Sequence, residues 1–387
     1  MITLEQILNS LNTPIAISLL AVVLVAMVYQ VYFYFRYINK GGAISTPQPQ
    51  TNHEDLPPVS VIVCARNEYN NLQEYLPILL SQDYPTYEVI IVDDSSEDDT
   101  EFLLERLKHQ YAHLYHTFVP RGARVLSSKK LALTIGLKAA HHEHILLTDA
   151  DCRPESKYWI REMMQGFANA DTEMVLGFSP YFEKKGLLNH LISYDTLFTG
   201  LQYTGMARAG FPYMGVGRNL AYKRSTFFGM GGFKGLLNNQ AGDDDLFVNR
   251  VATKKNTSVV CTRDSLIWSA PKTTWHEWLH QKRRHLSVSP QYNLKSKCRL
   301  TIEPISRALF YAGIIASFIW GGWMVAAIAA TLLVLRWIMQ MVIINISAHR
   351  LGIRKVGMGL FLYDILLPLI TLYIIATQRI TKKPLYW

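Results

Sequence analysis

An uncharged apolar run near the beginning of the chain limits what this sequence can fold into more than any other feature. Residues 15–35 (IAISLLAVVLVAMVYQVYFYF) contain no charged side chain and only one strongly polar one, Gln30. A run of this length can cross a bilayer as a single helix, and the tyrosines and Phe35 near its end suit the aromatic belt of a membrane interface. The sequence therefore predicts a membrane span here, with a buried core helix as the alternative.

Two more apolar blocks lie towards the end of the chain. The first, residues 308–348, is too long for one crossing, and Gly321-Gly322 gives it a place to fold into two spans. It contains Arg336, and a charge at that depth should face protein or water rather than lipid. The second block is residues 357–377. These blocks predict one span before the middle region and about three after it.

Basic residues beside the apolar blocks predict the orientation of the chain in its membrane. Arg36 and Lys40 follow the first span, and Arg350, Arg354 and Lys355 precede the last one. Cytoplasmic flanks are enriched in Lys and Arg, so the middle region is expected in the cytoplasm and the N-terminus outside, as for a bacterial inner-membrane protein. The tail, QRITKKPLYW, is basic, yet four spans would put it outside. Either one block is re-entrant, or the number of spans is three or five.

The middle region has the pattern of an α/β domain. Short β-branched runs (residues 59–65, 87–94 and 144–151) alternate with segments of helical periodicity (66–82, 97–110 and 129–140). Such alternation predicts a mostly parallel, wound sheet. A Gly/Pro-rich segment precedes it and indicates a boundary. The expected units are an N-terminal span in residues 1–40, a linker in 41–57, a cytoplasmic α/β domain in 58–300, and a membrane domain of about three spans in 301–387.

Polar residues follow three of the predicted strands at the point where each strand ends. They are Arg66-Asn67-Glu68, Asp93-Asp94 and Asp149-Ala150-Asp151. In wound sheets ligands bind beyond the carboxyl ends of the strands, so these groups converge on one crevice if the strands are neighbours. Taken alone, the first aspartate pair could cap a helix and the second could form a turn.

Several carboxylates in one crevice repel each other unless a cation shares them. Mg²⁺ or Mn²⁺ takes oxygen ligands and usually bridges to the phosphates of a substrate. The sequence has neither a Walker P-loop nor the G-x-G-x-x-G pattern, so an ordinary ATPase or dinucleotide site is not expected. The residues therefore predict a divalent metal that holds a nucleoside diphosphate.

Seven motifs follow in a characteristic order, in the stretches PPVSVIVCARNEYNNL, IIVDDSSEDDT, SSKKLALTIGL, TDADC, GVGRNLAYKRSTFFGMGGF, QAGDDDLFVNR and QKRRH. In this order they resemble the membrane-integrated family 2 glycosyltransferases, the group of hyaluronan, chitin and cellulose synthases and related lipid glycosyltransferases. The resemblance covers about residues 57–300. It implies a GT-A type nucleotide-sugar-binding domain, a wound mixed sheet flanked by transmembrane helices.

The resemblance also implies roles for individual residues. Asp149 and Asp151 match the metal-binding D-x-D motif, and Asp244 matches the catalytic base, with Asp243 as its catalytic neighbour in the acceptor pocket. The residues implied on the donor side are Ala65, Arg66, Glu68, Asp93, Asp94, Lys129, Asp149, Gln281 and Arg284. Those implied on the acceptor side are Gly217, Asn219, Asp243, Trp278 and His285.

One position departs from the family's pattern. His285 stands where the Q-x-x-R-W motif has a tryptophan that supports the terminal sugar of the acceptor. Trp275 and Trp278 could replace it, or could pack at an interface or anchor at the membrane surface. The resemblance implies an inverting, metal-dependent transfer from a nucleotide-sugar, by resemblance a UDP-sugar, to a glycan or lipid-linked acceptor. It favours polysaccharide synthesis slightly, with single addition to a lipid as the alternative.

Two other classes of function compete with a glycosyltransferase. The first is a channel or transporter with a regulatory nucleotide-binding domain, but about four spans are few for a transporter, and this class needs no base. The second is a nucleic-acid-binding membrane protein, suggested by the net charge of +9. Because the basic residues are scattered and form no run of five, we expect no nucleic-acid partner; the expected partners are donor, acceptor and bilayer.

Overall fold

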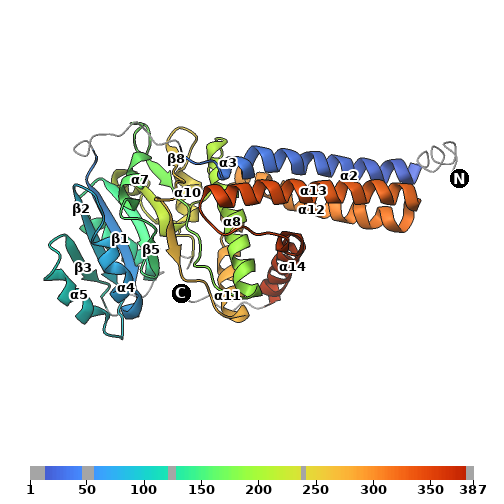
Figure 1. Cartoon of the computed structure of the whole chain (residues 1–387). Coiled ribbons are helices and arrows are strands. Elements are labelled where there is room, and N and C mark those ends of the chain that lie inside the picture. The colour runs from blue at the N-terminus through green and yellow to red at the C-terminus, as the bar shows by residue number, and fades with distance from the viewer. Residues whose placement is uncertain (1–13, 46–55, 121–127, 237–240, 381–387) are drawn as a thin grey trace.

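The computed structural model of the chain describes residues 14–45, 56–120, 128–236 and 241–380 (Figure 1). The strands are β1 (Val59–Ala65), β2 (Tyr87–Asp93), β3 (Leu114–Phe118), β4 (His144–Asp149), β5 (Cys152–Pro154), β6 (Met174–Leu176), β7 (Leu220–Lys223), β8 (Thr257–Val259) and β9 (Ile267–Ser269). The helices of the middle region are α4 (Tyr69–Leu79), α5 (Thr100–Lys108), α6 (Ser128–Ala139), α7 (Trp159–Gln165), α8 (Leu187–Arg208), η3 (Gly217–Asn219), α9 (Arg224–Gly229), α10 (Asp245–Val251), α11 (Trp275–Leu286) and η4 (Ser289–Gln291). The remaining helices are α2 (Pro14–Phe33), η1 (Tyr34–Ile38), α3 (Asn39–Gly41), α12 (Leu294–Trp320), α13 (Gly322–Arg350) and α14 (Gly359–Ile380).

A seven-stranded mixed sheet forms the centre of the middle region. Its strand order is β3-β2-β1-β4-β7-β6-β8, and a separate pair joins β5 to β9. The first four strands in this order run parallel, whereas β7 is antiparallel to both of its neighbours. Every residue of β1 is buried, as expected of a central strand with helices on both faces. The predicted α/β fold with a wound mixed sheet is confirmed.

The register of the parallel strands brings the three polar strand ends together. Ala65, the last residue of β1, pairs with Asp93 at the end of β2. On the other side of β1, Cys64 pairs with Asp149 at the end of β4. The residues that follow these strands therefore leave the sheet side by side, as the sequence predicts for neighbouring strands.

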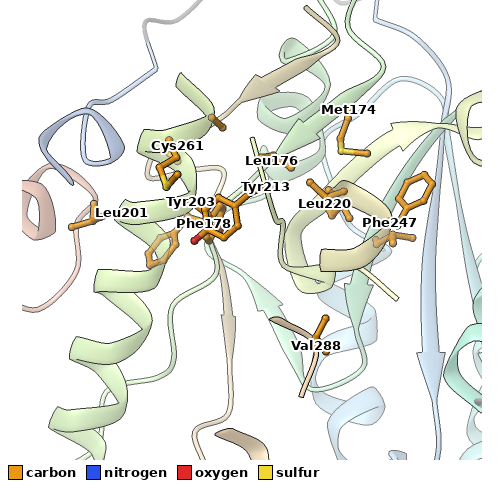
Figure 2. Packing of buried hydrophobic residues seen from close by; sticks show 14 of the residues in the cluster. Met174, Leu176, Phe178, Leu201, Tyr203, Tyr213, Leu220, Phe247, Cys261 and Val288 are labelled. Atoms are coloured by element: carbon orange, nitrogen blue, oxygen red, sulfur yellow. The ribbon is translucent and has the colours of Figure 1, made fainter. Parts of the chain in front are cut away.

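Helix α8 joins the sheet to the long apolar helices. Buried apolar side chains of the sheet and of α8 form one cluster, in which Phe178 lies beside Tyr203 while Leu201 lies on the opposite side of α8 (Figure 2). At its other end α8 contacts η1 and α3. Glycine is required on both sides of this contact, because a Cβ atom on Gly205 or Gly41 would overlap the facing backbone. The two parts of the molecule thus share one continuous core.

Among the described residues, four helices are long and apolar enough to cross a membrane. They lie in residues 14–41, 294–320, 322–350 and 359–377, so one apolar helix precedes the middle region and three follow it, where the sequence places the apolar blocks. Helices α2, α12 and α13 contact one another and form a long bundle, whereas α14 lies apart from it, across the bundle direction, beside α8 and α11 (Figure 1). The N-terminal and C-terminal segments used for the orientation argument lie partly outside the described residues.

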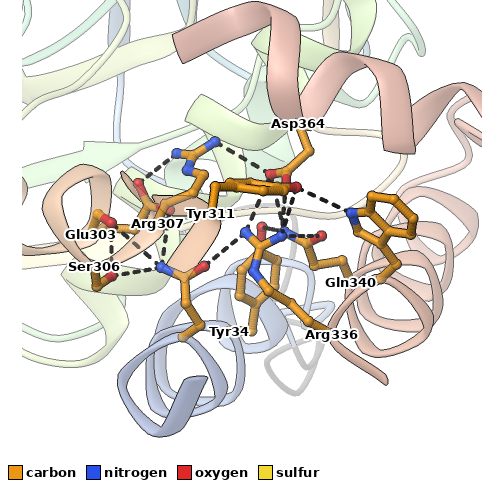
Figure 3. Close-up of polar contacts among 10 residues, drawn as sticks. Tyr34, Glu303, Ser306, Arg307, Tyr311, Arg336, Gln340 and Asp364 are labelled. Atoms are coloured by element: carbon orange, nitrogen blue, oxygen red, sulfur yellow. Dashed lines mark hydrogen bonds and ion pairs between the residues drawn. The ribbon is translucent and has the colours of Figure 1, made fainter. Parts of the chain in front are cut away.

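A buried polar network ties α14 to the bundle (Figure 3). Arg336 of α13 is fully buried, and its Nη1 donates to Asp364 of α14 at 2.6 Å. Its Nη2 donates to the side chain of Gln30 in α2 at 3.0 Å. Arg307 of α12 forms ion pairs with Glu303 and Asp364. The prediction that Arg336 faces protein rather than lipid is therefore confirmed.

Candidate active site

One end of the site begins with a buried carboxylate at the end of β2. Asp94 follows β2, is fully buried, and donates its backbone N–H to the carbonyl of Ala65 at 2.8 Å. Neither of its carboxylate oxygens has a hydrogen-bond partner within the described part of the chain. Because an unpaired buried carboxylate is costly, this one calls for a hydrogen-bond donor from a ligand. Asp93 beside it accepts from the backbone N–H of Ser96 at 3.0 Å and shapes the loop.

The D-x-D pair lies at the adjacent strand end. Asp151 Oδ2 accepts a hydrogen bond from Ser269 Oγ at 3.2 Å. Ser269 is the last residue of β9, so this strand fixes the orientation of the Asp151 carboxylate. Glu68, which precedes α4, faces the same place: burial raises the pKa of its carboxyl, and the negative charges of Asp151 and Asp149 add to the rise. Arg66, also at this edge, is half-buried. This edge of the sheet therefore carries several carboxylates close together.

Lys129 connects the D-x-D pair with the acidic residues before α10. Its ammonium donates to Asp149 Oδ1 at 2.9 Å and lies 3.6 Å from Asp243 Oδ2. Although burial opposes it, the charges of Asp149 and Asp243 hold the pKa of Lys129 well above its usual value. The ammonium is therefore a fixed positive charge between the two groups of carboxylates, which a diphosphate could also contact.

Three consecutive aspartates, Asp243, Asp244 and Asp245, lie at the N-terminus of α10, and each has a different environment. Asp245 is the first residue of the helix and Asp244 is its N-cap. Asp244 caps the helix by accepting from the N–H of Asp245 at 2.8 Å, and its other oxygen accepts from the N–H of Gly217 at 2.7 Å. Although burial opposes it, these hydrogen bonds and the charge of Lys129 lower the pKa of Asp244 to about 2. Burial instead raises the pKa of Asp243, against the opposing effect of Lys129. Asp244 is thus ionised and fixed in place.

Helix α11 carries the Q-x-x-R segment along the side of the site. Gln281 Nε2 donates to the hydroxyl of Tyr181 at 3.0 Å. Arg284 is half-buried, and His285 is exposed in the last turn of the helix. His285 interacts electrostatically with Arg284, Lys282, Asp244 and Arg218, so the end of α11 lies near Asp244.

Two residues expected on the acceptor side are buried instead. Asn219 has no exposed surface; its amide donates to the carbonyls of Phe178 and Ser265, and its oxygen accepts from Trp159. Trp278 is 1% exposed and packs in the core, whereas Trp275 is 45% exposed. Asn219 and Trp278 therefore support the site from behind and offer no face to an acceptor.

The structure adds three residues that the sequence analysis did not single out. Arg218 lies between Gly217 and Asn219, and its guanidinium stacks over the ring of Tyr181 at 4.4 Å. It also interacts electrostatically with Asp151 and Asp149. Tyr181 and Ser269 form an isolated β-bridge beside the D-x-D pair. The position of Arg218 inside a quoted motif was a signal; nothing in the sequence marks Tyr181 or Ser269.

The carboxylates suit a divalent cation only in combination with a ligand. Across the described ranges, no group of three or more His, Cys, Asp or Glu side chains is arranged to hold a metal ion. Asp149 and Asp151 supply two hard oxygen ligands at the edge of the sheet that carries several carboxylates. Mg²⁺ and similar ions are commonly held by one or two carboxylates together with water and substrate phosphates. The donor set therefore fits such an ion bound with a diphosphate.

Comparison with known proteins identifies the domain that contains this site. The profile of the family described as Glycosyl transferase family 2 matches residues 60–236. Residues 60–236 are a glycosyl transferase family 2 domain. The match includes Asp94, Asp149 and Asp151, and it ends before Asp243.

Curated relatives of this family 2 domain are also glycosyltransferases. The "Probable glycosyltransferase YdaM" of Bacillus subtilis (strain 168) is 24% identical over 285 residues, which are 70% of this chain and 65% of that protein. The "Poly-beta-1,6-N-acetyl-D-glucosamine synthase" of Staphylococcus epidermidis is 30% identical over 102 residues, 26% of this chain and 24% of that protein. The matched segments thus span less than two thirds of either relative.

A solved structure resembles nearly the whole chain, including its membrane helices. It is described as "Mannosyltransferase PcManGT from Pyrobaculum calidifontis in complex with GDP-Man and Mn2+". The similarity covers 96% of this chain and 99% of that one, with a TM-score of 0.61 and 21% sequence identity. The fold of the described chain, sheet domain and apolar helices together, is therefore shared with a known structure.

Proposed function

We propose that this family 2 glycosyltransferase moves a sugar, with inversion, from a nucleoside-diphosphate sugar to an acceptor at the cytoplasmic face of a membrane. The observation that carries the proposal is the carboxyl edge of the sheet. There Asp94 offers an unpartnered buried carboxylate to a nucleotide, and Asp149 and Asp151 offer oxygen ligands to a divalent cation. The description of the mannosyltransferase as a complex with GDP-Man and Mn2+ supports this assignment. Either UDP or GDP would satisfy these contacts.

Departure of the nucleoside diphosphate needs positive charge near its phosphates. Mg²⁺ or Mn²⁺ on Asp149 and Asp151 would supply part of this charge when bound. Lys129 lies 2.9 Å from Asp149 and can neutralise phosphate oxygens from the same side. Arg284 of α11 is the guanidinium that we assign to the other side, since a guanidinium can grip a phosphate through two hydrogen bonds.

The acceptor approaches from the side of Asp243 and Asp244. In an inverting displacement the acceptor oxygen forms its bond to the anomeric carbon as the bond to the diphosphate breaks. If the acceptor is a hydroxyl, Asp244 is the group that we assign to take its proton, as the family's pattern implies. With a pKa of about 2, Asp244 is a weak base in the free enzyme, because a general base works best when its pKa is near the working pH.

The arrangement of helices suggests three spans rather than four. Gln30 and Arg336 belong to one network. At a rise of about 1.5 Å per residue, Gln30 lies about 24 Å from the beginning of α2 at Pro14, and Arg336 lies about 21 Å from the beginning of α13 at Gly322. Both distances are shorter than the hydrocarbon core of about 30 Å, so we place the network within the inner leaflet. Asp364 anchors α14 at this depth. With α14 lying in the inner leaflet, we expect the basic segment after it on the cytoplasmic side, as the positive-inside rule favours.

Release of the nucleoside diphosphate tests the proposed function. The purified protein in lipid nanodiscs is incubated with Mn²⁺ or Mg²⁺ and a panel of UDP- and GDP-sugars, with a membrane lipid extract present. We expect release from at least one donor, loss of release on chelation, and loss in the Asp151→Asn variant. Asp171→Asn, a change at an exposed aspartate away from the sheet edge, serves as the matched control. Release that persists unchanged in Asp151→Asn, or no release from any donor, would contradict the proposal.

A further inference from the structure

Arg218 is a cation of the site that no carboxylate of the described chain neutralises. It is half-buried, and its Nε is buried without a hydrogen-bond partner among the residues that the structure describes. None of the ion pairs within the described ranges includes it. Because a buried charged donor without a partner costs free energy, this guanidinium calls for an anion from a ligand.

The backbone on both sides of Arg218 is fixed. Gly217 donates its N–H to Asp244 Oδ2 at 2.7 Å, and a Cβ atom at this glycine would lie 3.2 Å from the same oxygen. Asn219 is fully buried, and its amide donates to two backbone carbonyls, both at 2.8 Å. Arg218 therefore extends from a rigid turn, η3, directly beside the carboxylate that we assign as the base.

An aromatic ring fixes the side chain of Arg218. Its guanidinium lies 4.4 Å from the centroid of the Tyr181 ring, and the hydroxyl of this tyrosine accepts from Gln281 of α11 at 3.0 Å. Tyr181 also forms a β-bridge with Ser269, whose hydroxyl donates to Asp151. Stacking on the ring uses the face of the guanidinium and leaves the N–H groups at its edge for a ligand.

The D-x-D pair attracts Arg218 without binding it. Arg218 interacts electrostatically with Asp151 and Asp149, yet it forms an ion pair with neither of them. This arrangement suits a group that binds the cation directly and the carboxylates through a divalent metal. A phosphate has this property, because its oxygens accept hydrogen bonds from guanidinium groups and also ligate hard metal ions.

A second guanidinium without an ion pair lies towards the same side. Arg284 of α11 also belongs to none of the ion pairs in the described part of the chain. His285 interacts electrostatically with both Arg284 and Arg218, whereas Lys282 of the same helix pairs with Asp195 at 2.8 Å. Like charges near each other are unfavourable unless an anion shares them. The two guanidinium groups therefore agree with a phosphate bound at this place.

We infer that Arg218 binds the β-phosphate of the donor, which is the phosphate bonded to the sugar, and that it is a catalytic residue of the transfer. The inference rests on the proposed function and adds a residue to it. Asp244 is assigned to the acceptor, and the acceptor attacks the anomeric carbon. The phosphate bonded to that carbon is therefore the one nearer to the turn that carries Arg218.

The charge of Arg218 acts on the bond that breaks. As the bond from the anomeric carbon to the β-phosphate oxygen breaks, the electron pair stays on that oxygen and the phosphate gains a negative charge. A guanidinium fixed beside it stabilises this charge more than it stabilises the intact donor. Loss of Arg218 should therefore lower kcat as well as weaken diphosphate binding.

Binding without turnover tests the assignment. The full-length protein in nanodiscs is titrated calorimetrically with UDP, UMP, GDP and GMP in the presence of Mn²⁺; the monophosphates lack the β-phosphate. We expect Arg218→Gln to weaken binding of the preferred diphosphate by about tenfold or more, as for the loss of charge-assisted hydrogen bonds. Binding of the matching monophosphate should change by less than about twofold. Arg106→Gln makes the same change at an exposed arginine of α5 and should leave both affinities as they are.

A conservative variant covers the case in which Arg218→Gln does not fold. Arg218→Lys keeps the charge but loses the planar group that stacks on Tyr181 and binds a phosphate through two hydrogen bonds. It should bind the diphosphate more weakly than the original protein, and bind the monophosphate equally well. Diphosphate binding by Arg218→Lys as tight as in the original protein would overturn the inference.

The same titrations separate the inference from the proposed function. Diphosphate binding that is unchanged in Arg218→Gln, even if transfer to an acceptor is lost, would assign Arg218 elsewhere and overturn the inference. Equal weakening of the monophosphate and the diphosphate would overturn it too. In both cases metal-dependent release of the diphosphate by the original protein keeps the proposed function intact. An original protein that binds neither diphosphate in the presence of Mn²⁺ would contradict the proposed function itself.

Discussion

Three consecutive carboxylates, Asp243 to Asp245, concentrate negative charge at the beginning of α10. Asp244 accepts two backbone hydrogen bonds, and Asp243 lies 3.6 Å from the ammonium of Lys129. Asp245 accepts a hydrogen bond from the hydroxyl of Tyr292 at 3.0 Å, and its side chain also forms a hydrogen bond with that of Asp244. Burial and the charge of Asp244 raise the pKa of Asp245 well above its usual value. Of the three carboxyl groups, Asp245 is therefore the one whose ionisation lowers the stability of the folded state most.

This difference predicts how stability depends on pH. In the unfolded chain the Asp245 carboxyl loses its proton at about pH 3.9. In the folded protein its pKa is raised, so the carboxyl stays protonated above this pH. The folded state binds more protons in that window, so the contribution of Asp245 to the free energy of unfolding decreases as the pH rises through it. Asp245→Asn removes this effect and should raise the free energy of unfolding by about 1 kcal/mol or more at pH 7, with little change near pH 3.5.

Urea denaturation of the protein in detergent at both pH values checks this prediction. Asp264→Asn, at an exposed position, is the control and should change the free energy of unfolding little at either pH. A variant Asp245→Asn that is less stable than the original protein at pH 7 would show that the ionised carboxylate stabilises the fold through its contact with Tyr292.

At the scale of single elements, α11 depends on its first turn. Thr274 accepts from the N–H of Glu277, and the Glu277 side chain accepts from the N–H of Thr274, so the two residues form a capping box. Removing such a cap typically costs about 1 kcal/mol. We expect Thr274→Ala to loosen α11, which carries Gln281 and Arg284, and to raise KM for the donor more than it lowers kcat. Steady-state kinetics of Thr274→Ala and of His276→Ala, a change at an exposed residue of the same turn, check this; equal effects of the two changes would contradict it.

The elements around the donor site could be predicted from the sequence, because each has a strong local pattern. The run at 59–65 is β-branched and apolar, and it became β1 with the same bounds. The split of residues 308–348 at Gly321-Gly322 also appears, as the boundary between α12 and α13. The strands at 87–94 and 144–151 also appear, but β2 ends at Asp93 and β4 at Asp149. The existence and type of these elements follow from composition and length, whereas the ends of the strands do so only in part.

Other elements could not be predicted, because tertiary contacts define them. Helix α8 is buried on many sides, so its residues show little periodicity, and the sequence analysis assigned it no element. The bridge from Tyr181 to Ser269 joins segments far apart in the chain. Arg218 and Tyr181 gain their place in the site only through that pairing. The buried positions of Asn219 and Trp278 likewise depend on packing rather than on their motifs.

At the scale of the whole molecule, the membrane topology depends on where α14 lies. Three spans with α14 in the inner leaflet put the C-terminus on the same side as the catalytic domain. We expect a green fluorescent protein fused after Trp387 to fluoresce in bacterial cells, and an alkaline phosphatase fused there to be inactive. The same reporters fused before Met1 give the control, with the opposite outcome. An active C-terminal phosphatase would show that α14 crosses the membrane.

The network around Arg336 is what holds α14 in place. Asp364→Ala would leave a fully buried guanidinium without its carboxylate, a change that typically costs about 3–5 kcal/mol. We expect a markedly lower melting temperature in detergent and release of α14 from the bundle, seen as faster proteolysis of the segment after Arg350. Thr331→Ala, in the exposed face of α13, should melt like the original protein. A stable Asp364→Ala variant would mean that apolar packing alone positions α14.

A structure of the protein with Mn²⁺ and a nucleoside diphosphate would test the central claim most directly. Data collected at the manganese absorption edge locate the ion without ambiguity. We predict an anomalous peak between the carboxylates of Asp149 and Asp151, diphosphate oxygens near Lys129, and the nucleoside hydrogen-bonded to Asp94. A nucleotide bound away from the carboxyl edge of the sheet, or manganese on other residues, would contradict the account.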